Sequence, residues 1–330
     1  MRRWTRRPPG SNWGDFGDDD QVGRLNLITP ARRRAAMREV SEGLLFPLSL
    51  PLDYPRGEHI EASRKPPELF STPIGHNHRF APGFDDIACD DAVKMTLQFS
   101  TQWDGLGHIG ALFDADGDGE PEMVYYNGYR AHEHVIGDPK GSTTPAMKAL
   151  GIETMAMTGL QGRGVLVNLF DSCGLERIAV GYDRLMRMLD QQRAQVECGD
   201  ILCLYTGMDD LILNLGDSLE NRRIAHSCAA LDGKDQRLLR WVDESGVAAI
   251  ASDNVGVENW SGITASDDSI LLPLHHLCLF KLGIPLGELW YLSALASWLK
   301  QAGRTRFLLT APPLRLPGAV GSPVTPIATV

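Results

Sequence analysis

The sequence predicts an α/β protein, because apolar segments of strand length alternate with segments of helical periodicity. The strand-length segments are "GVLVNLF" (164–170), "DILCLYTG" (200–207) and "GVAAIASD" (246–253). Between them, apolar residues recur at helical spacing in "YDRLMRMLDQQRAQV" and "KDQRLLRWVDES". Strands that alternate with helices along a chain are typical of helices packed on the faces of a sheet.

The N-terminal portion, residues 1–90, is expected to be rich in loops, with one helix and one short strand. The helix is "TPARRRAAMREVSEG", with Thr29 as N-cap, Pro30 at its first position and Gly43 at its end. "LFPLSLPLDYP" follows as a short strand interrupted by prolines. Residues 57–91 show little periodicity, so we expect a long loop there.

The C-terminal portion adds two helices and a closing strand. These are "LHHLCLFKLG", "LWYLSALASWLKQAG" and "RFLLTAPPL". Neither an internal repeat nor a low-complexity linker interrupts the 330 residues, so the simplest expectation is one domain over residues 1–330.

Composition and charge narrow the classes of partner. Of the 330 residues, 43% are hydrophobic and 22% are charged, which is typical of soluble globular proteins. A formal net charge of −10 disfavours nucleic acid and anionic membranes as partners, because both attract basic surfaces. No apolar run approaches the roughly 20 residues of a membrane-spanning helix, and none follows the basic start "MRRWTRRPPG". We therefore expect a cytoplasmic protein.

An acidic segment, "DADGDGEPEMVY", partly matches a calcium-binding loop. Asp114, Asp116 and Asp118 stand at its first ligand positions, but the twelfth position holds Tyr125 instead of a bidentate glutamate. Pro121 also disfavours a helix leaving the loop. We interpret the segment as an acidic turn.

The segment "QFSTQWDGLGH" (98–108) is the strongest candidate for a functional site. We expect a strand to end at its start, so that Gln102 and Asp104, two residues apart in extended chain, point the same way. With Gln98 they offer one carboxylate and two amide oxygens, a hard half-shell for a divalent cation. His108 lies just beyond and suits an acid–base group. From this segment alone, a polar turn held by its own side chains fits slightly better.

A second polar pair occurs in "LHHLCLFKLGIPLGELW" (274–290). His275 opens an otherwise apolar helix, and Glu288 follows a Gly-Ile-Pro-Leu-Gly break in a similarly apolar setting. A carboxylate in such surroundings needs a cation or strong hydrogen-bond donors as its partner. One interpretation is that this pair completes the half-shell of the first segment. The adjacent His276 leaves the choice of histidine open by one residue.

Together these segments resemble the cyclase-like, metal-dependent hydrolase family, which includes bacterial kynurenine formamidase, isatin hydrolase and trans-dienelactone hydrolase. Much of that family carries the motif H-x-G-T-H-x-D-x-P-x-H. Gln98 and Gln102 stand at the positions of its leading histidines, as in the trans-dienelactone hydrolase branch, while Asp104 and His108 match the motif. The similarity continues through "GSNWGDFGDDDQVGRLNLIT", "YYNGY", "GRGVLV", "GDILCLYTG", "VAAIASDNVGVE" and "RFLLTAPPLRLPGAVGSPVTPIA".

The resemblance implies an α/β fold with a mixed sheet of the swivelling β/β/α type, assembled as a homodimer or homotetramer. It also implies one divalent ion, zinc or manganese. The implied ligands of the ion are Gln98, Gln102, Asp104, His275 and Glu288. His108 would take a proton from water and return it to the leaving group. Trp103, Tyr126 and Asn127 are candidates for orienting the substrate, with an ordinary place in the core or a turn as the alternative.

The implied activity is hydrolysis of a small lactone, ester or cyclic amide by water that the ion activates. One alternative is an arylformamidase that acts on N-formylkynurenine. Another is a binding protein that has kept the fold without catalysis.

Overall fold

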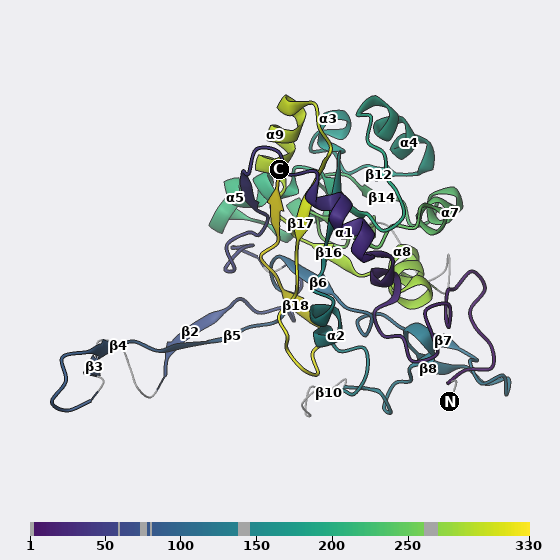
Figure 1. The fold of residues 1–330 in the computed structure, drawn as a ribbon, viewed down its shortest axis with the longest axis horizontal. Helices are drawn as coiled ribbons and strands as arrows, with labels where there is room; N and C mark the ends of the chain where they lie inside the picture. Colours follow the sequence, from purple (N-terminus) through teal and green to yellow (C-terminus); the bar gives the residue numbers. More distant parts are fainter. Residues whose placement is uncertain (1–2, 59, 73–77, 80, 138–145, 261–269) are drawn as a thin grey trace.

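A nine-stranded mixed sheet forms the centre of the molecule in the computed structural model (Figure 1), which describes residues 3–58, 60–72, 78–79, 81–137, 146–260 and 270–330. The strands lie in the order β1-β19-β17-β11-β13-β15-β16-β6-β18. Their bounds are β1 (Leu45–Pro47), β6 (Gln102–Asp104), β11 (Gln161–Asn168), β13 (Ile201–Tyr205), β15 (Ala249–Ser252), β16 (Leu286–Glu288), β17 (Arg306–Thr310), β18 (Gly321–Pro323) and β19 (Ile327–Thr329).

The middle of this sheet is parallel and its margins are antiparallel. β11, β13, β15 and β16 run parallel to one another, and their short apolar runs are buried almost throughout. β17, β19 and β1 add antiparallel on one side, and β6 and β18 on the other. The predicted α/β class with a mixed sheet is therefore confirmed.

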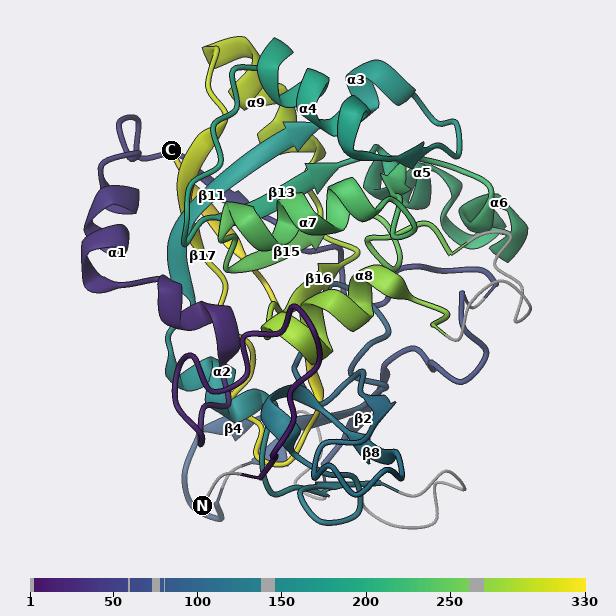
Figure 2. The ribbon, with the colours of Figure 1, turned by 90° about the vertical axis from the view of Figure 1, so that its right-hand side faces the viewer.

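Helices cover both faces of the sheet. On one face, α4 and α7 lie over the strands of the sheet (Figure 2). Together with the π-helical η4 they bury leucine, methionine and valine side chains against alternate residues of β11 and β13. On the other face, α2 and α9 pack against the intervening residues. The α-helices are α1 (Pro30–Met37), α2 (Ile152–Met157), α3 (Phe170–Cys173), α4 (Tyr182–Gln191), α5 (Met208–Leu215), α6 (Asn221–Ala225), α7 (Gln236–Ser245), α8 (Pro273–His275) and α9 (Ser293–Ala302). The 3-10 helices are η1 (Gly23–Leu27), η2 (Tyr126–Gly128) and η3 (Gly216–Ser218), and the π-helix is η4 (His276–Leu282).

The expected N-terminal helix begins where predicted and ends early. Thr29 caps α1 by accepting the Arg32 N–H at 3.3 Å, and Pro30 is its first residue. The helix stops at Met37 instead of Gly43, because the polar residues 38–43 offer little apolar surface to pack and intrinsic propensity alone rarely sustains a helix.

The expectation of a long loop over residues 57–91 is wrong. Two consecutive two-stranded ribbons form there and project from the body as an arm (residues 68–94; Figure 1). Their strands are β2 (Glu68–Ser71), β3 (His78–Arg79), β4 (Ile87–Ala88) and β5 (Asp91–Lys94). A ribbon exposed on both sides has no buried face, so its sequence carries little of the alternation that marks a half-buried strand.

Three further short pairs lie outside the main sheet. They are β7 (Ala111–Phe113) with β8 (Glu122–Val124), β9 (Val135–Ile136) with β10 (Ala146–Met147), and β12 (Ala179–Val180) with β14 (Ala230–Leu231). Within the residues the structure describes, no helix has the length and apolar character needed to cross a membrane.

Candidate metal centre

The second half of the "QFSTQWDGLGH" segment is a strand at the centre of the site. The predicted strand that ends at this segment is wrong: β5 stops at Lys94, Gln98 lies in a turn, and residues 102–104 form β6. β6 lies between β16 and β18, so Gln102 and Asp104 are both completely buried. The prediction that these two side chains point the same way follows from strand geometry, and the structure has them on one face of β6.

Register brings Glu288 to the same face. In the antiparallel pair of β6 with β16, Glu288 lies directly opposite Gln102. Residues directly opposite each other on neighbouring strands have their side chains on one side of the sheet. Glu288 is only 3% exposed, so its carboxylate needs a partner inside the protein.

A buried carboxylate orients His275, the last residue of α8. Glu258 accepts the His275 backbone N–H at 2.8 Å and the Leu274 N–H at 3.0 Å. Its Oε1 also lies 2.6 Å from His275 Nδ1, while His275 Nε2 is 3.6 Å from Glu288 Oε1. Glu258 therefore directs the free ring nitrogen toward Glu288, the arrangement found where a carboxylate positions a metal-binding histidine.

Asp104, His275 and Glu288 form a compact buried cluster, with one ligand atom from each lying within 4.8 Å of the others. Neither carboxylate oxygen of Asp104 has a hydrogen-bond partner among the described residues. Burial raises the pKa of Asp104, because no donor offsets the cost of its charge. The orphaned carboxylate and the donor set of two oxygens and one imidazole nitrogen fit a divalent cation.

The charge distribution agrees with that fit. Burial opposes a charge on His275, but Glu258 and Glu288 outweigh it and raise the pKa of the imidazole to about 10. Burial likewise opposes a charge on Glu288, but the attraction of the His275 imidazole 3.6 Å away leaves its pKa lowered. The chain thus concentrates two carboxylates at one buried point, with the His275 imidazole between Glu258 and Glu288 and with Arg64 and His108 at the edge.

The two glutamines lie beside this cluster. The Gln102 amide fits in two orientations. In one, Nε2 lies 3.3 Å from Glu288 Oε2; in the other, the nitrogen donates to the Ser100 and Gln98 carbonyl oxygens at 2.9 and 2.6 Å. The second satisfies both N–H groups and turns the amide oxygen toward Glu288, which is the orientation that a metal ligand requires.

Gln98 approaches from the turn before β6. A Cβ placed on Gly321, the residue opposite Asp104 on β18, would lie 2.5 Å from Gln98 Nε2. Only a glycine at that position leaves room for the amide. The structure therefore groups Asp104, His275 and Glu288, with the Gln102 amide next to Glu288 and the Gln98 amide beside Gly321.

His108 and Arg64 stand at the edge of the cluster. His108 Nε2 is 3.9 Å from Asp104 Oδ1, and its side chain is 23% exposed, so it reaches both the cluster and solvent. Arg64 Nη1 donates to the Gln98 carbonyl oxygen at 3.2 Å and lies 3.9 Å from Glu288 Oε2.

His276 does not belong to the cluster, which resolves the ambiguity of one residue in the sequence. It lies beside Phe280, with ring centroids 4.9 Å apart, and burial lowers its pKa to about 4. His275 is therefore the histidine of the candidate centre.

The structure does not place Trp103, Tyr126 or Asn127 against the cluster. Trp103 lies between Gln102 and Asp104 on β6, so strand alternation turns it to the opposite face, where Nε1 donates to the Ala311 carbonyl at 2.9 Å. Tyr126 is completely buried and packs on Gly283. Asn127 Nδ2 donates to the carbonyl oxygens of Gly17, Asp18 and Asp20. All three hold the core or the N-terminal loop, as the alternative interpretation had it.

The acidic turn brings Asp114, Asp116 and Glu122 together, but it differs from the buried centre. Arg6 pairs with Asp114 at 2.5 Å. Arg130 lies 3.0 Å from Glu122 and 3.6 Å from Asp116. Because arginines already compensate these partly exposed carboxylates, the turn interpretation stands.

Two residues of the site were missed by sequence reasoning. Glu258 is the last residue of "VAAIASDNVGVE", a segment that contributes to the family resemblance. The sequence therefore drew attention to this segment, but it did not indicate that Glu258 positions a histidine. Arg64 lies in a segment without periodicity, and no sequence signal connects it to the centre.

A mixed sheet with a buried carboxylate–imidazole cluster on β6, β16 and α8 defines an α/β protein with a candidate metal centre. The family model named Cyclase, described as "Putative cyclase", matches residues 46–259 of this chain. A crystal structure of a novel cyclase is 31% identical over 98% of this chain and 100% of its own, with a TM-score of 0.77. The chain belongs to the cyclase family.

More distant structures share the fold. Isatin hydrolase A from Ralstonia solanacearum is 13% identical over 86% of this chain and 91% of its own, with a TM-score of 0.57. A potential metal-dependent hydrolase with cyclase activity is 15% identical over 86% of this chain and 96% of its own, with a TM-score of 0.50. None of the curated proteins matches the chain in sequence.

Proposed function

We propose that the protein is a metal-dependent hydrolase that opens a small lactone, ester or cyclic amide. The observation that carries this proposal is Asp104, a completely buried carboxylate with no donor among the described residues, within 4.8 Å of the ligand atoms of His275 and Glu288. Zinc and manganese are the ions we favour. When bound, such an ion would polarise the carbonyl and make water more acidic.

The side chains of this chain would divide the remaining work. Asp104, Glu288 and His275 hold the ion, with the amide oxygens of Gln98 and Gln102 as neutral additions. Glu258 keeps His275 Nδ1 protonated and Nε2 available. His108, beside Asp104 yet reachable from solvent, takes the proton of the attacking water and returns it to the leaving oxygen or nitrogen.

The names of two structures with the same fold support ring opening in particular. The isatin hydrolases that share this fold act, by their names, on the cyclic amide isatin. A panel of lactones, isatin-like lactams and N-formylkynurenine, assayed with Mn²⁺ or Zn²⁺, would separate a lactonase or lactam hydrolase from an arylformamidase. Turnover of N-formylkynurenine alone would favour the arylformamidase.

Metal content and the His108→Asn variant test the mechanism. We expect one divalent ion per chain in protein incubated with Mn²⁺ or Zn²⁺. His108→Asn should keep that ion while turnover falls by roughly 10²–10⁴-fold, the usual contribution of a general acid–base. Loss of the ion in this variant would make His108 a ligand. Protein that binds no metal at all would reduce the chain to a binding protein with the cyclase fold.

We also infer that the chain assembles as a homodimer or homotetramer. The arm presents apolar side chains to solvent: Leu69 is 78% exposed and Val93, opposite it on the neighbouring strand, is 49% exposed. Ile87 on the same arm is 69% exposed. An isolated two-stranded ribbon is marginally stable in water, so a second copy that covers the arm would stabilise it. Light scattering on the parent and on Leu69→Lys tests this, and a monomeric parent would exclude it.

We place the protein in the cytoplasm. Four of the six cysteines, Cys173, Cys203, Cys228 and Cys278, are buried thiols, as in proteins of reducing compartments. Fractionation of the producing cells would test the location.

A further inference from the structure

Arg64 is a cation at the edge of a centre that is otherwise acidic. It precedes the first strand of the arm in the sequence, and its side chain is 27% exposed. Its Nη1 donates to the carbonyl oxygen of Gln98 at 3.2 Å. The same nitrogen is 3.9 Å from Glu288 Oε2, too far for a hydrogen bond.

Most N–H groups of the Arg64 guanidinium have no acceptor among the described residues. An arginine has five N–H groups, and the Gln98 carbonyl is the one acceptor Arg64 has among the described residues. A cation held by Asp104 and Glu288 would compensate those two carboxylates, which leaves the charge of Arg64 without a close partner. The planar guanidinium can donate two parallel hydrogen bonds to the two oxygens of a carboxylate.

The surroundings of Arg64 suit an organic anion. Arg64, Gln98 and one carboxylate, Glu61, line a small hollow together with the apolar side chains of Pro55, Ile60, Phe99, Val255 and Leu289. Apolar walls exclude water and strengthen an ion pair between the guanidinium and a bound carboxylate.

We propose that Arg64 binds a carboxylate group of the substrate, so that the enzyme selects carbonyl compounds that carry a carboxylate near the bond to be cleaved. This inference rests on the proposed hydrolase function. Arg64 thereby fixes which side of the substrate faces Glu288 and His108.

Calorimetry with benzoate tests the anion site without any turnover. Benzoate would be titrated into Mn²⁺-loaded parent, Arg64→Gln, Arg64→Lys and Arg56→Gln, with manganese content measured in each. Arg56 is the matched control, because it is a partly exposed arginine nearby in sequence that pairs with Asp53. We expect Arg64→Gln to weaken benzoate binding on the order of 10- to 100-fold, as hydrogen bonds to charged groups do. Arg64→Lys should fall between, and Arg56→Gln should match the parent.

Unchanged benzoate affinity in Arg64→Gln, or no benzoate binding by the parent, overturns the proposal. If Arg64 only compensated the charge of Glu288, its removal would tighten Mn²⁺ binding and leave benzoate binding alone.

A kinetic arm separates this proposal from the hydrolase itself. For any substrate of the panel, a carboxylate-bearing form and its carboxamide twin would be compared. Arg64→Gln should lower kcat/KM for the anionic form alone, mainly through KM. An equal fall in kcat for both forms would make Arg64 a stabiliser of the developing oxyanion and overturn the anion site. If no panel compound is turned over by the Mn²⁺-loaded parent, the hydrolase proposal fails, and the benzoate titration still decides Arg64.

Discussion

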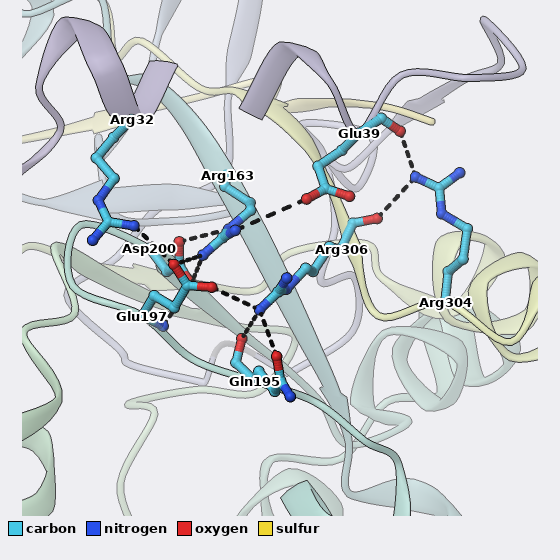
Figure 3. A network of polar contacts seen from close by, with 8 residues as sticks. All are labelled: Arg32, Glu39, Arg163, Gln195, Glu197, Asp200, Arg304 and Arg306. Atoms are coloured by element: carbon cyan, nitrogen blue, oxygen red, sulfur yellow. Dashed lines mark hydrogen bonds and ion pairs between the residues drawn. The ribbon is translucent and has the colours of Figure 1, made fainter. Parts of the chain in front are cut away.

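Two groups of charged side chains in this protein are built in opposite ways, and Figure 3 shows the first of them. In the first, Arg163 on β11 donates to both oxygens of Asp200 at 2.9 and 3.0 Å. The same guanidinium lies 3.1 Å from Glu197, which Arg32 and Arg306 also contact at 2.8 and 3.0 Å. Every charge in this group, which we call the closed network, has a partner of opposite sign within the chain.

The metal centre is the second group, and it is left incomplete. Asp104 is as deeply buried as Asp200, yet it has no donor within the described part of the chain. The comparison shows that burial of a carboxylate is not by itself a sign of function. The missing partner is the sign, because a stable fold keeps an uncompensated buried charge only where something outside the chain supplies the compensation.

Breaking the closed network should have the largest effect on stability. Arg163→Met leaves Asp200 buried and unpaired, so we expect the free energy of unfolding to fall by about 3–5 kcal/mol, with or without metal. Urea denaturation would measure it. As a control, Arg56→Met removes a half-exposed pair with Asp53 and should change stability far less, because water and salt screen exposed ion pairs. Equal losses in the two variants would remove the distinction between buried and exposed pairs.

Asp104→Asn should have a different signature. Metal at 100 times its Kd stabilises a protein by about 2.7 kcal/mol, and we expect this gain in the parent and none in the variant. Without metal, the variant should be at least as stable as the parent, since a neutral amide costs less to bury than an unpaired carboxylate. Thermal melts with EDTA and with Mn²⁺ would show both effects. A variant that is destabilised in EDTA like Arg163→Met would mean that Asp104 is already compensated.

Glu258→Gln tests the carboxylate that positions His275 in the metal centre. The amide keeps the shape but holds His275 Nδ1 less firmly, so metal affinity should fall roughly 10- to 100-fold. Competition with a fluorescent chelator would measure the affinity. Unchanged affinity would assign Glu258 to the fold alone, through its bonds to the Leu274 and His275 backbone.

Gly321→Ala is the mildest change that reaches the centre. The added Cβ would lie 2.5 Å from Gln98 Nε2 and must displace that amide. If Gln98 is a ligand, metal affinity should fall by roughly 3- to 10-fold, the value of one modest interaction. Gly137→Ala serves as the control, because its Cβ would meet no atom of the described residues within 4 Å. Affinity equal to that of the control would leave Gln98 as a residue of the turn.

Much of this architecture was predictable from local patterns. Short apolar runs predicted the buried parallel strands, and Thr29 followed by Pro30 predicted the N-cap of α1. Both signals depend only on residues that are close in the sequence. The arm was not predictable, since a ribbon exposed on both sides has no burial pattern to display.

For the site, the sequence by itself determined which residue types were available: two amides and a carboxylate in one segment, and a histidine and a carboxylate in another. Strand alternation also implies that Trp103 faces away from Gln102 and Asp104. The tertiary structure alone decided how these residues meet. The register of β6 with β16 places Glu288 opposite Gln102, and the contact with Glu258 makes His275, not His276, the histidine of the centre. Arg64, which precedes the arm in the sequence, lies 3.9 Å from Glu288. These contacts join residues far apart in the chain, and no periodicity within one segment encodes the register of another.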